Sequence, residues 1–183
     1  MPTKPEILKL SRPDQPRLFH VEQVHLRFSN GEERVFERLI TPPRGAVMVI
    51  AIDSDDHLLL IREYAAGLDE YVLTLPKGVI DPGEDAIAAA NRELQEEAGH
   101  AARELHLIKR ISAAPNYMGH MLDLVVARNL YPSQLEGDEP EPLEVVRFPM
   151  ADIDELVTRA EFHEGRAIAA LYLVKNWLAQ QQA

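Results

Sequence analysis

The chain has 183 residues, a formal net charge of −11 and no cysteine. Its length suits one domain with a small appendage. The absence of cysteine excludes disulfides, thiol nucleophiles and zinc–thiolate sites, and the acidic balance argues against nucleic-acid binding, which needs a cationic surface for the phosphate backbone. A small phosphate substrate is still compatible with this charge, provided that metal ions bridge protein carboxylates and phosphate oxygens.

Apolar segments of the kind that enter membranes are missing from the sequence. No apolar run approaches the ~20 residues of a membrane span, and the residues after Met1 do not form the apolar segment of a signal peptide. We therefore expect a cytoplasmic protein without a membrane partner.

The first 45 residues are predicted to form an arm and an antiparallel β-hairpin. Residues 1–17 are polar and proline-rich. Apolar and polar residues then alternate over 24–28, Asn30-Gly31 is predicted as a type I′ turn, and a second strand is expected over 35–40. Residues 41–45, Thr-Pro-Pro-Arg-Gly, indicate a linker to a second unit that covers 46–183.

The second unit is predicted to be an α/β domain with one mixed sheet between helical layers. The continuous apolar run over 46–52 indicates a strand that is covered on both faces. A long acidic loop is expected over 130–141. Further strands are expected over 58–64, 71–75, 105–112, 121–127 and 145–148, and helices over 84–98, 152–159 and 166–180.

The helix over 84–98 carries an unusual group of carboxylates. A turn at 81–83, Asp-Pro-Gly, precedes it, and Gly99 is predicted as its left-handed C-cap. Glu93, Glu96 and Glu97 lie near its C-terminus, where the helix dipole disfavours negative charge. Because residues three and four apart are neighbours on a helix, these three side chains share one face.

Two interpretations of this carboxylate group remain open at this stage. Most charge clusters are solvated helix faces. Arg92 can pair with Glu96 or reach back to Glu84, but one arginine cannot neutralise three glutamates. Hard divalent cations can do so, since carboxylate oxygens are their preferred ligands.

The stretch from Gly78 to Gly99 resembles the signature of the Nudix hydrolases. That signature is Gly-x5-Glu-x7-Arg-Glu-U-x-Glu-Glu-x-Gly-U, where U is apolar, and eight of its nine specified positions match. His100 replaces the last apolar residue, which is a packing position. The matching residues are Gly78, Glu84, Arg92, Glu93, Leu94, Glu96, Glu97 and Gly99.

The resemblance implies a Nudix fold, an α/β/α sandwich, and metal-dependent chemistry. By this resemblance, Glu93 and Glu97 bind Mg²⁺ or Mn²⁺, two or three ions per site. Glu96 assists them, and the backbone carbonyl of Lys77 completes the site. Arg92 orients the glutamates through an ion pair with Glu84.

Further stretches resemble the ADP-ribose pyrophosphatase-like branch of the family, and within it the ADP compounds hydrolase type, over nearly the full length. They include 28–31, 60–65, 77–84 and 135–143. Pro115, sixteen residues past Gly99, and Tyr117 support the branch, although both are also common turn residues. The resemblance implies hydrolysis of ADP-ribose, Ap3A or NADH, with release of AMP. It also implies a homodimer formed through the N-terminal hairpin.

The general base is expected in the acidic loop, where five carboxylates lie within nine residues that contain no Lys or Arg. Similarity to the branch, whose base precedes the final strand, favours Glu141, with Glu139 as the alternative; the other loop acids are expected to be solvated. Arg62 and Glu63, at the end of an apolar strand, are candidate substrate contacts. Arg38 is a weaker one, since such residues more often form surface ion pairs.

Two other functions stay open as alternatives. One is an ADP-sugar or diadenosine polyphosphate hydrolase. Another is a non-catalytic Nudix module that only binds its ligand, although a module of that kind need not keep every metal ligand. The stretch from Gly78 to Gly99, called the box below, indicates how the reaction proceeds. It indicates little about which nucleoside diphosphate derivative is bound.

Overall fold

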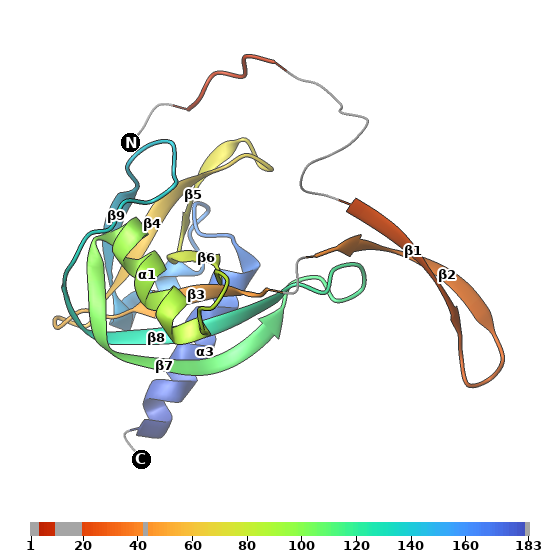
Figure 1. The fold of residues 1–183 in the computed structure, drawn as a ribbon. Helices are drawn as coiled ribbons and strands as arrows, with labels where there is room; N and C mark the ends of the chain where they lie inside the picture. Colours follow the sequence, from red (N-terminus) through yellow and green to blue (C-terminus); the bar gives the residue numbers. More distant parts are fainter. Residues whose placement is uncertain (1–3, 10–19, 42–43, 182–183) are drawn as a thin grey trace.

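The computed structural model describes residues 4–9, 20–41 and 44–181. Most of the predicted arm, and the centre of the predicted linker, lie outside these residues. β1 (His20–Arg27) and β2 (Glu33–Ile40) pair as the predicted antiparallel hairpin, which projects from the rest of the chain (Figure 1). At its base the Leu39 N–H donates to the Tyr117 carbonyl, with an N–O distance of 2.8 Å.

The hairpin turn differs from the prediction. A type I′ turn needs positive φ at both central residues; Gly31 has a φ of 86°, but Asn30 is not among the residues with positive φ. The last strand pair is Arg27 with Glu33, so five residues connect the strands instead of two. The type I′ prediction was therefore wrong, because the Asn-Gly signal lies inside a longer loop.

The remaining strands form two sheets, whereas one was predicted. In the mixed sheet, whose order is β6-β3-β8-β7, β3 runs parallel to β8. The other sheet is antiparallel, with the order β5-β4-β9. The strands are β3 (Ala46–Ala51), β4 (His57–Ala65), β5 (Glu70–Thr74), β6 (Lys77–Val79), β7 (His100–Ser112), β8 (Met121–Pro132) and β9 (Glu144–Pro149).

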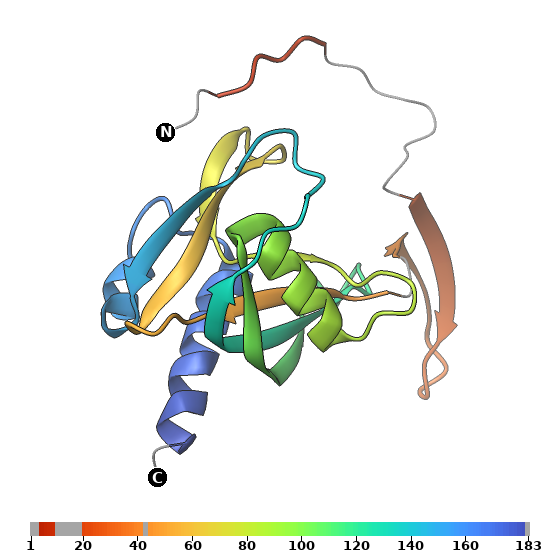
Figure 2. The same ribbon diagram turned by 60° about the vertical axis from the view of Figure 1, so that its left-hand side comes forward.

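Two helices cover opposite faces of β3 (Figure 2). Val47 and Val49 pack with α1 (Ala86–Ala98), and Met48 and Ile50 pack in the core of α3 (Gly165–Gln181). The continuous apolar run is thus buried on both sides, as a strand between two layers requires. The predicted α/β/α class is confirmed.

Several element boundaries also differ from the prediction. β6 was not predicted, and β8 takes residues 130–132 from the expected acidic loop. The predicted helix over 152–159 is a 3-10 turn (Met150–Asp152) followed by the short α2 (Ile153–Leu156). In the described part of the chain, no helix has the length and apolar character needed to cross a membrane.

Candidate active site

Both ends of α1 are capped, which fixes the position of its carboxylates. Asp85 is the N-cap, and its side chain accepts a hydrogen bond from the Ala88 N–H at 2.8 Å. Gly99 ends the helix with a φ of 65°, and its N–H donates to the Leu94 carbonyl. The predicted helix and its left-handed cap are confirmed.

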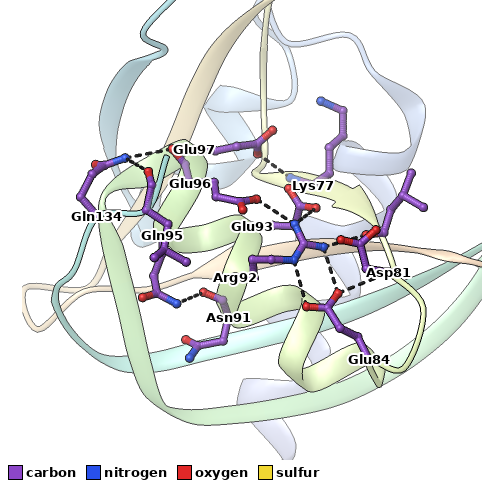
Figure 3. A network of polar contacts seen from close by, with 12 residues as sticks. Lys77, Asp81, Glu84, Asn91, Arg92, Glu93, Gln95, Glu96, Glu97 and Gln134 are labelled. Atoms are coloured by element: carbon purple, nitrogen blue, oxygen red, sulfur yellow. Dashed lines mark hydrogen bonds and ion pairs between the residues drawn. The ribbon is translucent and has the colours of Figure 1, made fainter. Parts of the chain in front are cut away.

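Arg92 gathers the box carboxylates around its guanidinium group (Figure 3). Its Nε lies 2.9 Å from Glu84 Oε1, and its Nη1 lies 2.8 Å from Glu93 Oε1 and 2.7 Å from Glu96 Oε2. The bonds from Arg92 lower the pKa of Glu84, and the bond to Glu84 raises the pKa of Arg92. Arg92 therefore joins the turn before α1 to the acidic face of the helix.

Two of the glutamates are buried. Glu93 is 7% exposed and Glu97 is 6% exposed. The Lys77 N–H donates to Glu97 Oε2 at 2.8 Å. Burial nevertheless raises the pKa of Glu93, and it raises the pKa of Glu97 to about 8. For both side chains, the effect of burial therefore outweighs the contacts from Arg92 and Lys77, which lower the pKa.

Gly78 lies directly against the Glu93 carboxyl group. A Cβ at this position would lie 2.0–2.3 Å from the carboxyl atoms of Glu93, well inside contact distance. The first glycine of the box therefore gives the space in which β6 and the carboxylate of α1 meet.

A cleft of about 770 Å³ opens in front of these groups. Eight acidic and three basic side chains line it, so it is strongly negative. They are Glu63, Asp81, Glu93, Glu96, Glu97, Glu136, Asp138 and Glu139, with Lys77, Arg92 and Arg166.

Several of the predicted substrate contacts do not line this cleft. Arg62 is 8% exposed and pairs with Glu144 and Glu161, at 3.2 and 3.0 Å. Arg38 lies on the projecting hairpin and pairs with Glu22 across the two strands at 2.7 Å. Pro115 and Tyr117 belong to the connection between β7 and β8, which contacts the base of the hairpin.

The two candidates for the general base are separated. Glu139 lines the cleft, and its charge, together with that of Glu96, adds to the effect of burial in raising the pKa of Glu93. Glu141 is not in the lining; its carboxylate accepts a hydrogen bond from the Tyr71 hydroxyl. The structure thus brings the alternative residue, Glu139, next to the box.

Arg166 and His120 are among the cleft residues that were not predicted from the sequence. Arg166, in the first turn of α3, and His120, just before β8, both line the cleft. Lys77 pairs with Glu63, and Arg166 pairs with Glu164. No local pattern marks Arg166 or His120, since only the packing of α3 and β8 brings them to this cleft.

The donors fit a hard divalent cation in their chemistry. The side-chain donors are carboxylate oxygens, and burial raises the pKa values of Glu93 and Glu97, an effect that a bound cation would oppose. Arg92 Nη1 bonds both Glu93 and Glu96. Within the described ranges, no three Asp, Glu or His side chains are grouped as an ion would require. An ion would therefore take the place of part of the Arg92 contacts.

Comparisons with known proteins show similarities over nearly the whole chain. Residues 42–171 match the NUDIX domain, and residues 5–38 match the NudE-type Nudix hydrolase N-terminal domain. The chain is 51% identical to ADP compounds hydrolase NudE of Escherichia coli (strain K12), over 97% of this chain and 95% of that one. It is 28% identical to an ADP-ribose pyrophosphatase of Bacillus subtilis (strain 168), over 89% and 88% of the two chains. A crystal structure of an ADP compounds hydrolase superposes with a TM-score of 0.87 at 50% identity, covering 98% of this chain and 96% of the other. The chain belongs to the Nudix hydrolase family.

Proposed function

We propose that the chain is a metal-dependent pyrophosphohydrolase that cleaves ADP-linked compounds such as ADP-ribose, Ap3A and NADH and releases AMP. The observation that carries this proposal is the cleft lined by eight acidic and three basic side chains, with the buried Glu93 and Glu97 among the acidic ones. Such a cleft repels a pyrophosphate unless cations lie between them. The 51% identity to an ADP compounds hydrolase supports the substrate class.

In this proposal Glu93, Glu96, Glu97 and the Lys77 carbonyl hold two or three Mg²⁺ or Mn²⁺ ions. Bound there, such ions neutralise charge on the pyrophosphate and acidify a water molecule. Arg92 orients Glu93 and Glu96 and ties them to Glu84.

Glu139 is the general base in this proposal, and its position in the cleft lining supports the role. Its carboxylate takes the proton of the attacking water, whose oxygen forms a bond to one phosphorus. The bond from that phosphorus to the bridging oxygen breaks, and the electron pair goes to the leaving phosphate. The products are AMP and a second phosphate compound.

We further propose that residues 1–45 are a dimerisation unit and 46–183 the catalytic unit. A two-stranded hairpin alone is marginally stable in water, yet this one exposes Phe28 and Phe36. A homodimer would cover these residues. It would also give Arg38 a route to a substrate that it cannot reach in its own cleft.

A product assay with Mg²⁺ tests the function. We expect AMP from ADP-ribose, Ap3A and NADH, and none after addition of EDTA. Release of AMP from ADP-glucose alone would favour the narrower ADP-sugar hydrolase. No metal-dependent AMP from any of these four compounds would overturn the proposal and favour a ligand-binding module.

A further inference from the structure

The connection between β8 and β9, residues 133–143, is attached to α1 at its first end. The Ser133 N–H donates to the Gly99 carbonyl at 3.1 Å, and the Ser133 hydroxyl donates to Gln95 Oε1 at 2.8 Å. Gln134 Nε2 donates to the carbonyl of Glu96 at 3.1 Å. This end of the loop is therefore fixed to the helix that carries the box carboxylates (Figure 3).

The second end is attached to the other sheet. The Tyr71 hydroxyl, on β5, donates a hydrogen bond to Glu141. This bond raises the pKa of Tyr71 to about 12. The Tyr71 ring also packs edge-on against Tyr64, with ring centroids 5.5 Å apart.

Between these attachments the loop lines the cleft. Glu136, Gly137, Asp138 and Glu139 all belong to the lining. Glu139 turns back over the loop, since a Cβ on Gly137 would lie 2.6 Å from Glu139 Oε2. Pro140 and Pro142 flank Glu141 and restrict the backbone on both sides of it. We therefore expect a displacement of Glu141 to shift Glu139, which is only two residues away.

We propose that Tyr71 is a positioning residue for hydrolysis: its hydrogen bond to Glu141 holds the loop so that Glu139 faces the cleft. The proposal rests on the proposed function, in which Glu139 is the base. Glu141 is then the anchor of the loop and does not take the proton.

The first test compares Tyr71→Phe with Tyr64→Phe. Both variants remove one hydroxyl from the same ring pair, but the Tyr64 hydroxyl bonds Asp69, at 2.5 Å, and not the loop. We expect Tyr71→Phe to lower kcat for ADP-ribose about tenfold, because a small misplacement of a catalytic group is costly, while KM and the melting temperature stay near wild type. Tyr64→Phe should retain wild-type kcat. Equal kcat values in the two variants would overturn the proposal.

The second test uses Glu141 itself. The amide oxygen of Glu141→Gln can still accept the Tyr71 hydrogen bond, whereas Glu141→Ala cannot. We expect the Gln variant to be about tenfold faster than the Ala variant, which should resemble Tyr71→Phe. If both variants lose activity as severely as Glu139→Gln, Glu141 is the base and the proposal fails.

The third test asks whether Tyr71 acts through Glu139. In a Glu139→Gln background, the added Tyr71→Phe change should lower kcat no further, because the group that it positions is already gone. An equal loss in both backgrounds would overturn the positioning role alone. Near wild-type turnover of Glu139→Gln would instead overturn the base of the proposed function, and the positioning role with it.

Discussion

Gly78 and Glu93 lie so close together that the side chain of any other residue would displace the carboxylate. For Gly78→Ala, the new Cβ would lie 2.0–2.3 Å from the carboxyl atoms of Glu93. We expect kcat with Mg²⁺ to fall about 10- to 100-fold, since disturbing a metal ligand costs about that factor in metal affinity or activity.

The matched control is Gly67→Ala. A Cβ at Gly67 meets nothing within 4 Å, and Gly67 is not among the glycines with positive φ. It should keep wild-type kcat. Steady-state kinetics over a range of Mg²⁺ concentrations measure both variants, and a Gly78→Ala enzyme with normal kcat and Mg²⁺ dependence would contradict the close contact.

Glu97 makes the stability of the metal-free protein depend on pH. Its pKa is about 8 in the folded chain, against an ordinary value of 4.5. Between these values the folded state binds more protons than the unfolded state, so the free energy of unfolding falls as pH rises. The stabilisation is complete below pH 4.5 and is lost as pH rises through 8. We expect Glu97→Gln to be less pH-dependent, with a difference of about 3 kcal/mol between pH 5 and 8.

Urea unfolding in EDTA at pH 5, 6.5 and 8 measures this effect. Glu93 also has a raised pKa, but it is present in both proteins, so the difference between their pH slopes reports Glu97. Parallel slopes would show that Glu97 ionises normally. Added Mg²⁺ should flatten the slope of the wild type, because a cation stabilises the carboxylate.

Of the predicted residues that line the cleft, Glu63 and Glu139 come from separate parts of the chain, and the others come from one short stretch. Arg92, Glu93, Glu96 and Glu97 share a face because helix geometry alone brings i, i+3 and i+4 together. Arg166 joins them from the far end of the chain through packing that no local pattern encodes. The choice between Glu139 and Glu141 depends on the path of a loop, which the sequence does not determine at the level of one residue.

At the scale of elements, the N-cap of α1 supports the whole carboxylate face. Asp85→Ala removes the acceptor of the Ala88 N–H. We expect the free energy of unfolding to fall by about 1 kcal/mol. Asp85→Ser keeps an oxygen acceptor and should lose less than half of that. Chemical denaturation compares the two; equal stability of Ala and Ser variants would show that the cap does not hold the helix.

Elements with strong periodicity or continuous burial were predicted well, and those defined by pairing were not. β3 and α3 carry their own apolar patterns. β6 is three residues long and exists because it pairs with β3, with Lys77 opposite Met48. The end of β8 is likewise set by pairing with the start of β7, where His100 lies opposite Pro132. Short sequence windows do not contain these partners.

At the scale of the molecule, the layers were predicted and the division into two sheets was not. Apolar strands and amphipathic helices are sufficient to indicate an α/β/α arrangement. Which strands pair is decided by long-range contacts, such as β4 with β9, which bring Arg62 to Glu144. The buried ion pair of Arg62 follows from that pairing. Because the sequence does not show the pairing, Arg62 was predicted as a substrate contact, although it lies outside the cleft.

One face of the hairpin carries the apolar side chains that the proposed homodimer would cover. Cross-strand pairs lie on the same side of a sheet, and Val24 pairs with Phe36. Leu26, two residues after Val24, and Ile40, four residues after Phe36, lie on that same side. Phe36 is 44% exposed, and Phe28 packs against it edge-on. A charge placed there would be buried in a dimer and solvated in a monomer.

We therefore expect Phe36→Asp to convert a dimer into a monomer in analytical ultracentrifugation, with a Kd at least about 100-fold weaker, because an unpaired buried carboxylate costs several kcal/mol. Val35→Asp is the matched control, since Val35 lies on the opposite face, opposite His25, and should leave the dimer intact. If the dimer brings Arg38 to a bound substrate, Phe36→Asp should also raise KM for ADP-ribose, whereas Val35→Asp should not. A Phe36→Asp protein as dimeric as the wild type would rule out this face as the interface.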